Sequence, residues 1–306
     1  MVEYEPGRWF KILFRVNGSV LPRIIFRVTA VVLFSGVLTY LQFGIGYDLP
    51  NSVRLHTVVG VALGLLLVFR TNASYERFWE GRILVGQMVN NSRDLARKSA
   101  SYLADSPVEI RENIGRYLIA LFAVIRRSLR RERETSELSA LLTESERGVL
   151  EESSAPPLIV ARWLTDQFQA ENDAGRVSDT KLRLFDPNLT ELIALWGGAE
   201  RILKTPIPFA YAHHIKGFLL VFCLTSPLAL LDSMGVFTPL GVAIIAYGLF
   251  GIDEIGIEIE EPFGYHTNDL PMDGIGETIA RNVCDVLNLD AALIPAPQDG
   301  KRGIFR

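Results

Sequence analysis

The sequence predicts an all-α, polytopic membrane protein with four transmembrane helices and a helical region in water. Three observations support this fold class. The mean hydropathy of the 306 residues is positive, at +0.22, although 22% of them are charged. Four long apolar stretches account for the hydropathy. The segments between them repeat apolar residues at the period of an α-helix and carry almost no strand signal.

The four apolar stretches form two close pairs along the chain. With its flanks, each can cross a hydrocarbon core of about 30 Å as a helix. A buried helix of a soluble protein is the alternative for any single stretch, but four stretches in two pairs favour the bilayer. Short links join the members of each pair, so each pair is expected to form a hairpin that crosses and returns. The expected spans are residues 24–46, 54–77, 212–231 and 235–253.

Basic residues are distributed unevenly around these spans. Loops rich in Lys and Arg face the cytoplasm in most membrane proteins. The two short links contain Arg54 as their single basic residue. We therefore expect both termini, residues 78–206 and residues 254–306 to be cytoplasmic, in a multi-pass protein of the inner (plasma) membrane without a cleavable signal peptide. The basic residues outside the links are Arg8, Lys11, Arg15, Arg23 and Arg27, which precede the uncharged residues 28–45 of the first span, and Arg70, Arg77, Arg82, Arg93, Arg97 and Lys98, which follow the apolar residues 55–69 of the second.

The central segment is expected to be helical. Helix period continues from the second span without a breaker, and Pro107 suits the first turn of a further helix. Asp179 or Thr180 could cap a helix, and Pro187 is expected to interrupt it. The expected helices are residues 73–102, 107–131, 137–152, 158–170, 188–203 and 273–289.

Two charged runs have a structural and a functional interpretation. The basic run Arg126–Arg133 is expected to be a solvated helix face, and attraction of anionic lipid or permeant anions is the alternative. The acidic run that starts at Asp253 and ends at Glu261 is expected to be a solvated helix end, and cation binding is the alternative.

Signals of an enzyme are weak in the sequence. A glycine-rich phosphate loop, a zinc-protease motif and a nucleophile elbow are all absent from it. The two cysteines, Cys223 and Cys284, are too far apart for a metal-binding pair, and we expect free thiols. The net charge of −4 gives no reason to expect nucleic-acid binding. No enzymatic activity, cofactor or metal site is therefore expected.

The second span carries an apolar stripe. Val61, Leu65 and Phe69 follow one another at intervals of four residues, so they share one face of a helix. Gly60 and Gly64 lie on another face, where small residues allow close helix contact. The polar stretch after Phe69 contains no helix breaker. A helix that leaves the lipid unbroken suits the lining of a pore, and a lipid-facing stripe is the alternative.

Several separated blocks of the sequence resemble those of bacterial bestrophins. These blocks are RTNASYERFWEGR (70–82), KTPIPFAY (204–211), DEIGIEIEEPFG (253–264) and NDLPMD (268–273), and their order and spacing agree over nearly the whole chain. The signature positions are Arg70, Asn72, Ser74, Arg77, Trp79, Glu80, Glu261, Pro262, Phe263 and Gly264. The resemblance implies one channel domain over residues 1–306, assembled as a homopentamer around one axial pore.

The resemblance also assigns roles along the pore. The three neck residues of the family fall on Val61, Leu65 and Phe69, the stripe already identified from its spacing. Five copies of each would form hydrophobic rings that gate by excluding water. The family's cytoplasmic aperture falls on Lys181, where an apolar residue is usual. Five lysines around a narrow opening would attract anions and repel cations. Tyr265–Asp269, which follows the EPFG block, contains a single carboxylate, so no calcium site is expected.

The sequence and the resemblance together predict a channel for small monovalent ions that favours anions such as chloride. Its expected partners are further copies of itself, membrane lipids and the permeant ions. A cation-selective bestrophin-type channel is the first alternative. A secondary transporter, or a membrane scaffold that would not need the apolar stripe, are the alternatives from other classes.

Overall fold

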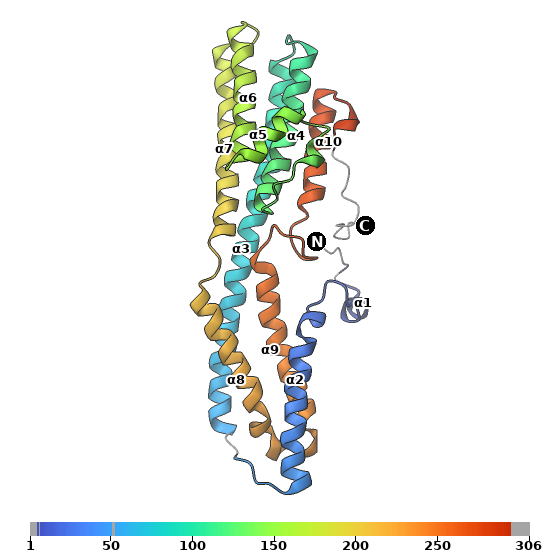
Figure 1. Cartoon of the computed structure of the whole chain (residues 1–306), viewed down its shortest axis with the longest axis vertical. Coiled ribbons are helices and arrows are strands. Elements are labelled where there is room, and N and C mark those ends of the chain that lie inside the picture. The colour runs from blue at the N-terminus through green and yellow to red at the C-terminus, as the bar shows by residue number, and fades with distance from the viewer. Residues whose placement is uncertain (1–4, 6, 51–52, 295–306) are drawn as a thin grey trace. The chain divides into compact units, whose positions relative to one another are not determined.

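A computed structural model describes residues 5, 7–50 and 53–294, and these residues form helices and connecting turns without a strand (Figure 1). The chain divides into two compact units. The described residues from 5 to 78 and Pro206–Glu261 form the first, here called the apolar unit. Among the described residues, Trp79–Thr205 and residues 262–294 form the second, the polar unit.

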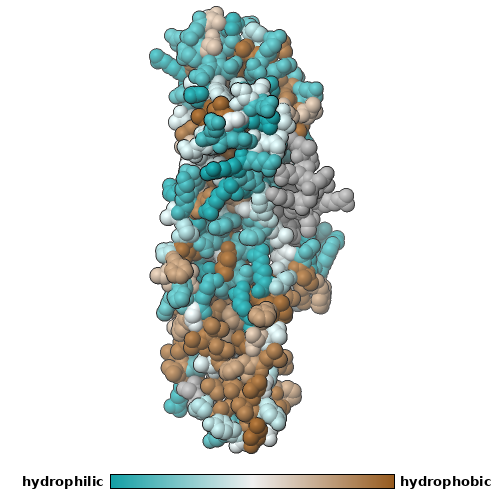
Figure 2. Space-filling view, viewed as in Figure 1, coloured by the Kyte–Doolittle hydropathy of each residue, from teal (hydrophilic) through white to brown (hydrophobic). Residues whose placement is uncertain are grey.

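The apolar unit is a bundle of long helices. The helices α2, α8 and α9 pack against one another, and buried side chains of α3 join the same hydrophobic cluster. On the face seen in Figure 2, apolar side chains gather over this unit, whereas hydrophilic ones cover most of the polar unit. The helices are α1 (Trp9–Leu13), α2 (Leu21–Tyr40) with a π-turn at Leu41–Ile45, the first part of α3 (Val53–Tyr102), α8 (Phe209–Met234) and α9 (Thr238–Glu260).

Three stretches of helix are long and apolar enough to cross a membrane: Leu21–Ile45, Val53–Tyr102 and Phe209–Glu260. The third contains both α8 and α9. Gly235–Phe237, expected to begin the fourth span, instead forms a 3₁₀ turn between these two helices, and Gly235 has a positive φ of 54°. The number of four spans therefore stays a prediction. The prediction that both chain ends are cytoplasmic concerns residues 1–4 and 295–306. These residues lie outside the described part of the chain.

The polar unit is built around α4. This helix packs against α6, α7 and α10. Nearly every residue of its second half is buried, as expected for a helix surrounded by others. The helices of this unit are the second part of α3, α4 (Val108–Leu129), α5 (Glu144–Glu152), α6 (Pro156–Asp173), α7 (Asp179–Lys204) and α10 (Met272–Leu287), with 3₁₀ turns at Ser136–Leu138 and Ala291–Leu293.

The prediction that helix continues unbroken from the second span is confirmed, because α3 runs from Val53 to Tyr102. The helix expected over residues 137–152 is shorter than predicted. Its start is fixed by Thr143, which accepts a hydrogen bond from the Glu146 backbone while the Glu146 carboxylate accepts one from the Thr143 backbone. This reciprocal arrangement ends the preceding turn and begins α5.

The expected interruption at Pro187 is wrong. Pro187 lies inside α7, which continues to Lys204. A proline in a helix interior removes one backbone hydrogen bond, but Phe185 and Leu189 on either side of it are buried and hold the helix together by packing. The expected cap at Asp179 or Thr180 is also wrong, because the side chain of Ser178 caps α7 by accepting from the Lys181 backbone.

Candidate functional site

The part of α3 in the apolar unit has a buried and an exposed face. Leu63 and Leu67 are buried in the hydrophobic cluster. Val61, Leu65 and Phe69 are 65%, 55% and 63% exposed. The three side chains predicted from their spacing to share one face therefore share a face that the rest of the chain leaves uncovered.

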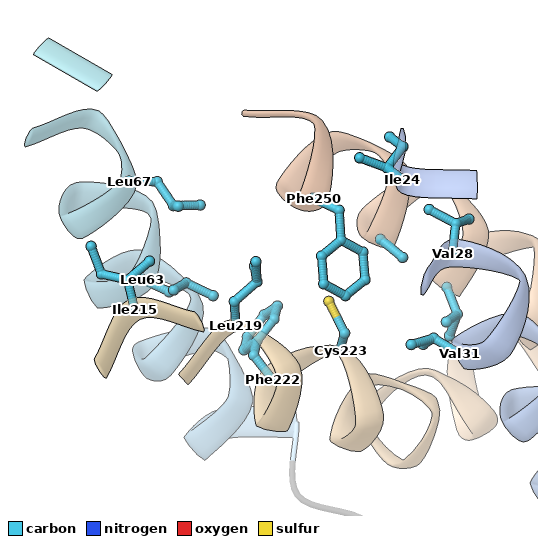
Figure 3. Close-up of a cluster of buried hydrophobic side chains, with 12 residues drawn as sticks. Ile24, Val28, Val31, Leu63, Leu67, Ile215, Leu219, Phe222, Cys223 and Phe250 are labelled. Atoms are coloured by element: carbon cyan, nitrogen blue, oxygen red, sulfur yellow. The ribbon is translucent and has the colours of Figure 1, made fainter. Parts of the chain in front are cut away.

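The hydrophobic cluster determines which way α3 is turned. Figure 3 shows Leu63 and Leu67 of α3 directed toward Ile215 and Leu219 of α8, with Phe250 beyond them. Close packing of these leucine side chains against α8 stabilises the arrangement, because packing rather than exclusion of water holds helices together in a bilayer. Because Leu63 and Leu67 must face inward, the residues two positions before or after them point to the opposite side of the helix.

Of the two glycines on α3 that were predicted to allow close helix contact, Gly60 lies close to α8. A Cβ atom on Gly60 would lie 3.1 Å from the Phe222 ring, so this contact is tight. A Cβ atom on Gly64 would meet nothing within 4 Å. The prediction of close helix contact is therefore confirmed at Gly60 and not at Gly64.

A buried ion pair lies directly behind the exposed stripe. Arg70 is 2% exposed, and its guanidinium pairs with the Asp253 carboxylate on α9. The Glu260 carboxylate is 3.9 Å from the Arg70 Nη2, and the Lys216 Nζ is 3.9 Å from the Asp253 Oδ2. Charges removed from water in this way need partners. The pair therefore ties α3 to α9 at the point where the apolar stripe ends.

Asp253, Glu254 and Glu258 of the acidic run on α9 are buried and paired, so the predicted solvated helix end is wrong for these three, whereas Glu261 at its end is exposed. Glu254 and Glu258 are almost fully buried. The Arg27 Nη2 lies 2.5 Å from Glu254, and the Arg23 Nη1 lies 3.7 Å from Glu258. The acidic side chains thus neutralise basic groups of α2 and α3. The missed signal was the position of Asp253 and Glu254 at the end of an apolar stretch, where charged side chains usually have partners.

The signature residues of the RTNASYERFWEGR block separate into two groups. Ser74 is buried like Arg70, whereas Asn72 is exposed. The Arg77 Nε donates a hydrogen bond to the Glu260 backbone carbonyl over 3.2 Å. The side chain of Trp79 is half exposed, and Glu80 pairs with Arg201 of α7 at 2.5 Å.

Two signature blocks meet within the polar unit. Pro262 and Phe263 are buried, whereas Gly264 is partly buried and Glu261, the last residue of the apolar unit, is exposed. A Cβ atom on Gly81 would lie 2.9 Å from the Pro262 ring and 3.1 Å from that of Phe263. Glycine is therefore required at position 81 for these blocks to pack together, a role that sequence reasoning missed.

In the basic run at the end of α4, Arg126, Arg127 and Arg130 are largely buried and paired, so the predicted solvated face is wrong for these three, whereas Arg131 and Arg133 are exposed as predicted. Arg126 and Arg127 each contact Glu137. Arg130 donates to the Asp273 carboxylate and to the backbone carbonyl of Phe263. Burial acts to raise the pKa of Glu137, but the hydrogen bonds and positive charge of Arg127 and Arg126 outweigh it and hold this pKa below its usual value. The run stabilises the fold of the polar unit.

Lys181 lies in the first turn of α7. Its ammonium is 5.7 Å from the centre of the Tyr102 ring, a distance typical of a cation–π contact. The neighbouring Thr180 is exposed. Among the described residues, no group of three or more His, Cys, Asp or Glu side chains could hold a metal ion.

The chain is similar to known proteins over most of its length. A family model described as "Bacterial/Fungal Bestrophin protein" matches residues 1–285. Two relatives are both named voltage-dependent anion channel-forming protein. The one from Nostoc sp. is 39% identical over 284 residues, covering 92% of each chain. The one from Synechocystis sp. is 40% identical over 288 residues, covering 93% of this chain and 94% of the relative.

The fold is similar to a solved structure of the same kind. The crystal structure of a bacterial bestrophin homolog from Klebsiella pneumoniae superposes with a TM-score of 0.80 at 32% sequence identity. The match covers 87% of this chain and 99% of that one.

Proposed function

The chain belongs to the bacterial and fungal bestrophin family, and from this premise we propose that it forms a homopentameric channel for small anions, including chloride. Members of this family are ion channels rather than enzymes, and the long apolar helices are those of a membrane protein. Its relatives in Nostoc and Synechocystis carry names that describe anion channel formation. The family resemblance supplies the number of five subunits.

The observation that supports the pore is the exposed apolar stripe of α3. Val61, Leu65 and Phe69 lie outside the protomer's hydrophobic cluster, although their side chains are apolar. In a pentamer with α3 nearest the axis, five copies of each would form three rings. Such rings stop ions by excluding water and open when the helices move apart. We propose that this stripe is the neck of the channel.

Selectivity is proposed to arise at Lys181. Gly175–Asp179 match the pattern Gly-Arg-hydrophobic-x-Asp, which in the family precedes the cytoplasmic aperture. The aperture position then falls on Lys181 in the first turn of α7, which brings a positive charge to it. A ring of ammonium groups in a narrow opening raises the local concentration of anions. The contact with Tyr102 limits how far each side chain can swing.

The proposed topology places both termini, residues 78–206 and residues 254–306 in the cytoplasm, with the protein in the inner (plasma) membrane. The basic residues around the spans support this orientation. We treat residues 1–306 as one channel domain, because α3 contributes residues to both compact units.

The experiment that tests the function is a reversal potential. Purified protein is reconstituted in planar bilayers under a KCl gradient, and unitary currents are recorded. Currents that reverse near the chloride potential support the proposal. Reversal near the potassium potential would establish the cation-selective alternative. Assembled protein without unitary currents would reject the channel and favour a transporter or scaffold.

A further inference from the structure

One buried carboxylate organises the segment that leads into α7. Glu171, near the end of α6, is 1% exposed. Its two carboxylate oxygens accept hydrogen bonds from the Nε and Nη2 of Arg176, over 2.6 Å and 2.7 Å. Two parallel bonds of this kind fix both the distance and the orientation of the guanidinium. The Arg176 side chain is 37% exposed, and its guanidinium is held against the end of α6 by this pair.

The same residue also holds the backbone of the turn. The Glu171 carbonyl accepts from the backbone amides of Arg176 and Val177 over 3.0 Å and 3.1 Å. Gly175 has a positive φ of 75°, which permits the sharp change of chain direction between α6 and α7. Val177 is buried. The five residues from Ala174 to Ser178 thus form a defined turn rather than a loose loop.

Glu171 connects this turn to a third element. Ser106, in the link between α3 and α4, donates its hydroxyl to the Glu171 carboxylate at 2.5 Å. Figure 1 shows the α3–α4 link and the α6–α7 turn at the same end of the polar unit. On the other side of the turn, the Asn172 side chain donates to the Val177 carbonyl and to the Asp179 carboxylate. The first turn of α7 is therefore attached to α6.

We propose that Glu171 and Arg176 form a structural clamp that positions the Thr180–Lys181 turn, and hence the selectivity aperture, relative to α3 and α6. This inference rests on the proposed function of Lys181. Glu171 is a positioning residue, because it acts through the backbone of α7 and does not itself meet the permeant ion. Breaking the clamp leaves Lys181 in the chain but lets the α7 start move, so the ring of charge becomes wider and less selective.

The test uses the full-length channel in planar bilayers. Glu171→Gln removes the charge pair while keeping the side-chain size. Its matched control is Asp166→Asn, which makes the same chemical change on the same helix in the exposed pair of Arg162 and Asp166. We expect the reversal potential of Glu171→Gln to move toward zero and that of Asp166→Asn to equal the wild type. Arg176→Lys is expected to lie between Arg176→Gln and the wild type.

A second readout is independent of ion flow. A spin label on Thr180→Cys reports the motion of the α7 start, because both native cysteines are buried. We expect the label to become more mobile with Glu171→Gln and to be unaffected by Asp166→Asn. If Glu171→Gln does not assemble, the reversal potential and the label mobility are measured on Arg176→Gln instead.

The outcomes separate this inference from the proposed aperture. If Lys181→Glu changes selectivity while Glu171→Gln and Arg176→Gln change neither selectivity nor label mobility, the clamp is wrong. If label mobility rises but neither Lys181→Glu nor Glu171→Gln changes selectivity, the clamp exists and the aperture at Lys181 is rejected.

Discussion

Phe69 and Arg70 are adjacent on α3, yet Phe69 is 63% exposed whereas Arg70 is 2% exposed and paired with Asp253 of α9. The ion pair and the buried leucines of α3 lie on one side of the helix, and the stripe lies on the other. An arginine buried beside an apolar segment can be satisfied in few positions. Arg70 therefore fixes the direction in which Phe69 points.

Phe69→Ala is expected to increase the basal conductance severalfold, because it removes the largest side chain from the proposed hydrophobic neck. Single-channel recording in planar bilayers measures the effect. Phe26→Ala is the matched control, since Phe26 is an exposed phenylalanine on α2. An unchanged conductance in an assembled Phe69→Ala channel would remove Phe69 from the pore.

Lys181→Glu is expected to shift permeability toward cations, because the charge of the proposed aperture changes sign. The measurement is the reversal potential under a KCl gradient. Arg183→Glu makes a comparable charge change at an exposed position two residues along α7, and it should leave the ratio near the wild-type value. Equal shifts in both variants would indicate a general surface-charge effect instead of an aperture.

Asp253→Asn is expected to destabilise the apolar unit by about 3–5 kcal/mol, because the buried Arg70 charge loses its close partner and keeps the more distant Glu260 carboxylate, 3.9 Å from its Nη2. The thermal unfolding of the detergent-solubilised protein measures this loss. Asp48→Asn is the control, since Asp48 is exposed. A melting temperature equal to the wild type would mean that water reaches Arg70 and replaces Asp253.

Gly81→Ala is expected to destabilise the polar unit by about 1–3 kcal/mol, because the added methyl group overlaps the rigid Pro262 ring. Gly197→Ala, in the interior of α7, meets no atom within 4 Å. There the gain in helix propensity should stabilise the protein by up to about 1 kcal/mol. Opposite shifts of the melting temperature in these two variants are the expected result, and shifts of the same sign would contradict it.

The stability of the protein is expected to fall in acid partly through Glu171. The hydrogen bonds from Arg176, and then that from Ser106, hold the pKa of Glu171 below its usual value. The unfolded chain has a pKa of about 4.3 at this residue. Glu171 therefore contributes stability that is complete above that pH and is lost as the pH falls through the lower folded value.

Melting temperatures measured between about pH 6 and pH 3 test this linkage. Glu171→Gln should be less stable than the wild type at pH 6 and show a shallower decline in acid. Glu152→Gln, at an exposed position, should follow the wild-type curve. Parallel curves for Glu171→Gln and the wild type would show that the pKa of Glu171 is not lowered by folding.

The sequence predicts the helices far better than it predicts the environment of charged side chains. Helix period, Pro107 and the absence of a breaker after Phe69 are local signals, and α4 and the continuous α3 confirm them. Pro187 is the exception, because the burial of Phe185 and Leu189 is a tertiary effect that outweighs a local breaker.

The predicted stripe of Val61, Leu65 and Phe69 is exposed as a single face because spacing alone determines which residues share a side of a helix. The partners of Asp253, Glu171 and Arg130 could not be predicted in the same way. Each pairs with a residue on another element or across a turn, and composition alone made the two charged runs look solvated.

The two cysteines have a practical consequence for studying the stripe. Cys223 lies in the hydrophobic cluster of the apolar unit, and burial raises the pKa of the Cys284 thiol on α10. A thiol that is buried and protonated reacts slowly with alkylating reagents. The natural chain therefore provides a background of low reactivity. In the proposed channel, a cysteine introduced at Val61, Leu65 or Phe69 is expected to be modified from the aqueous phase, and the rate of modification would report when water reaches each level.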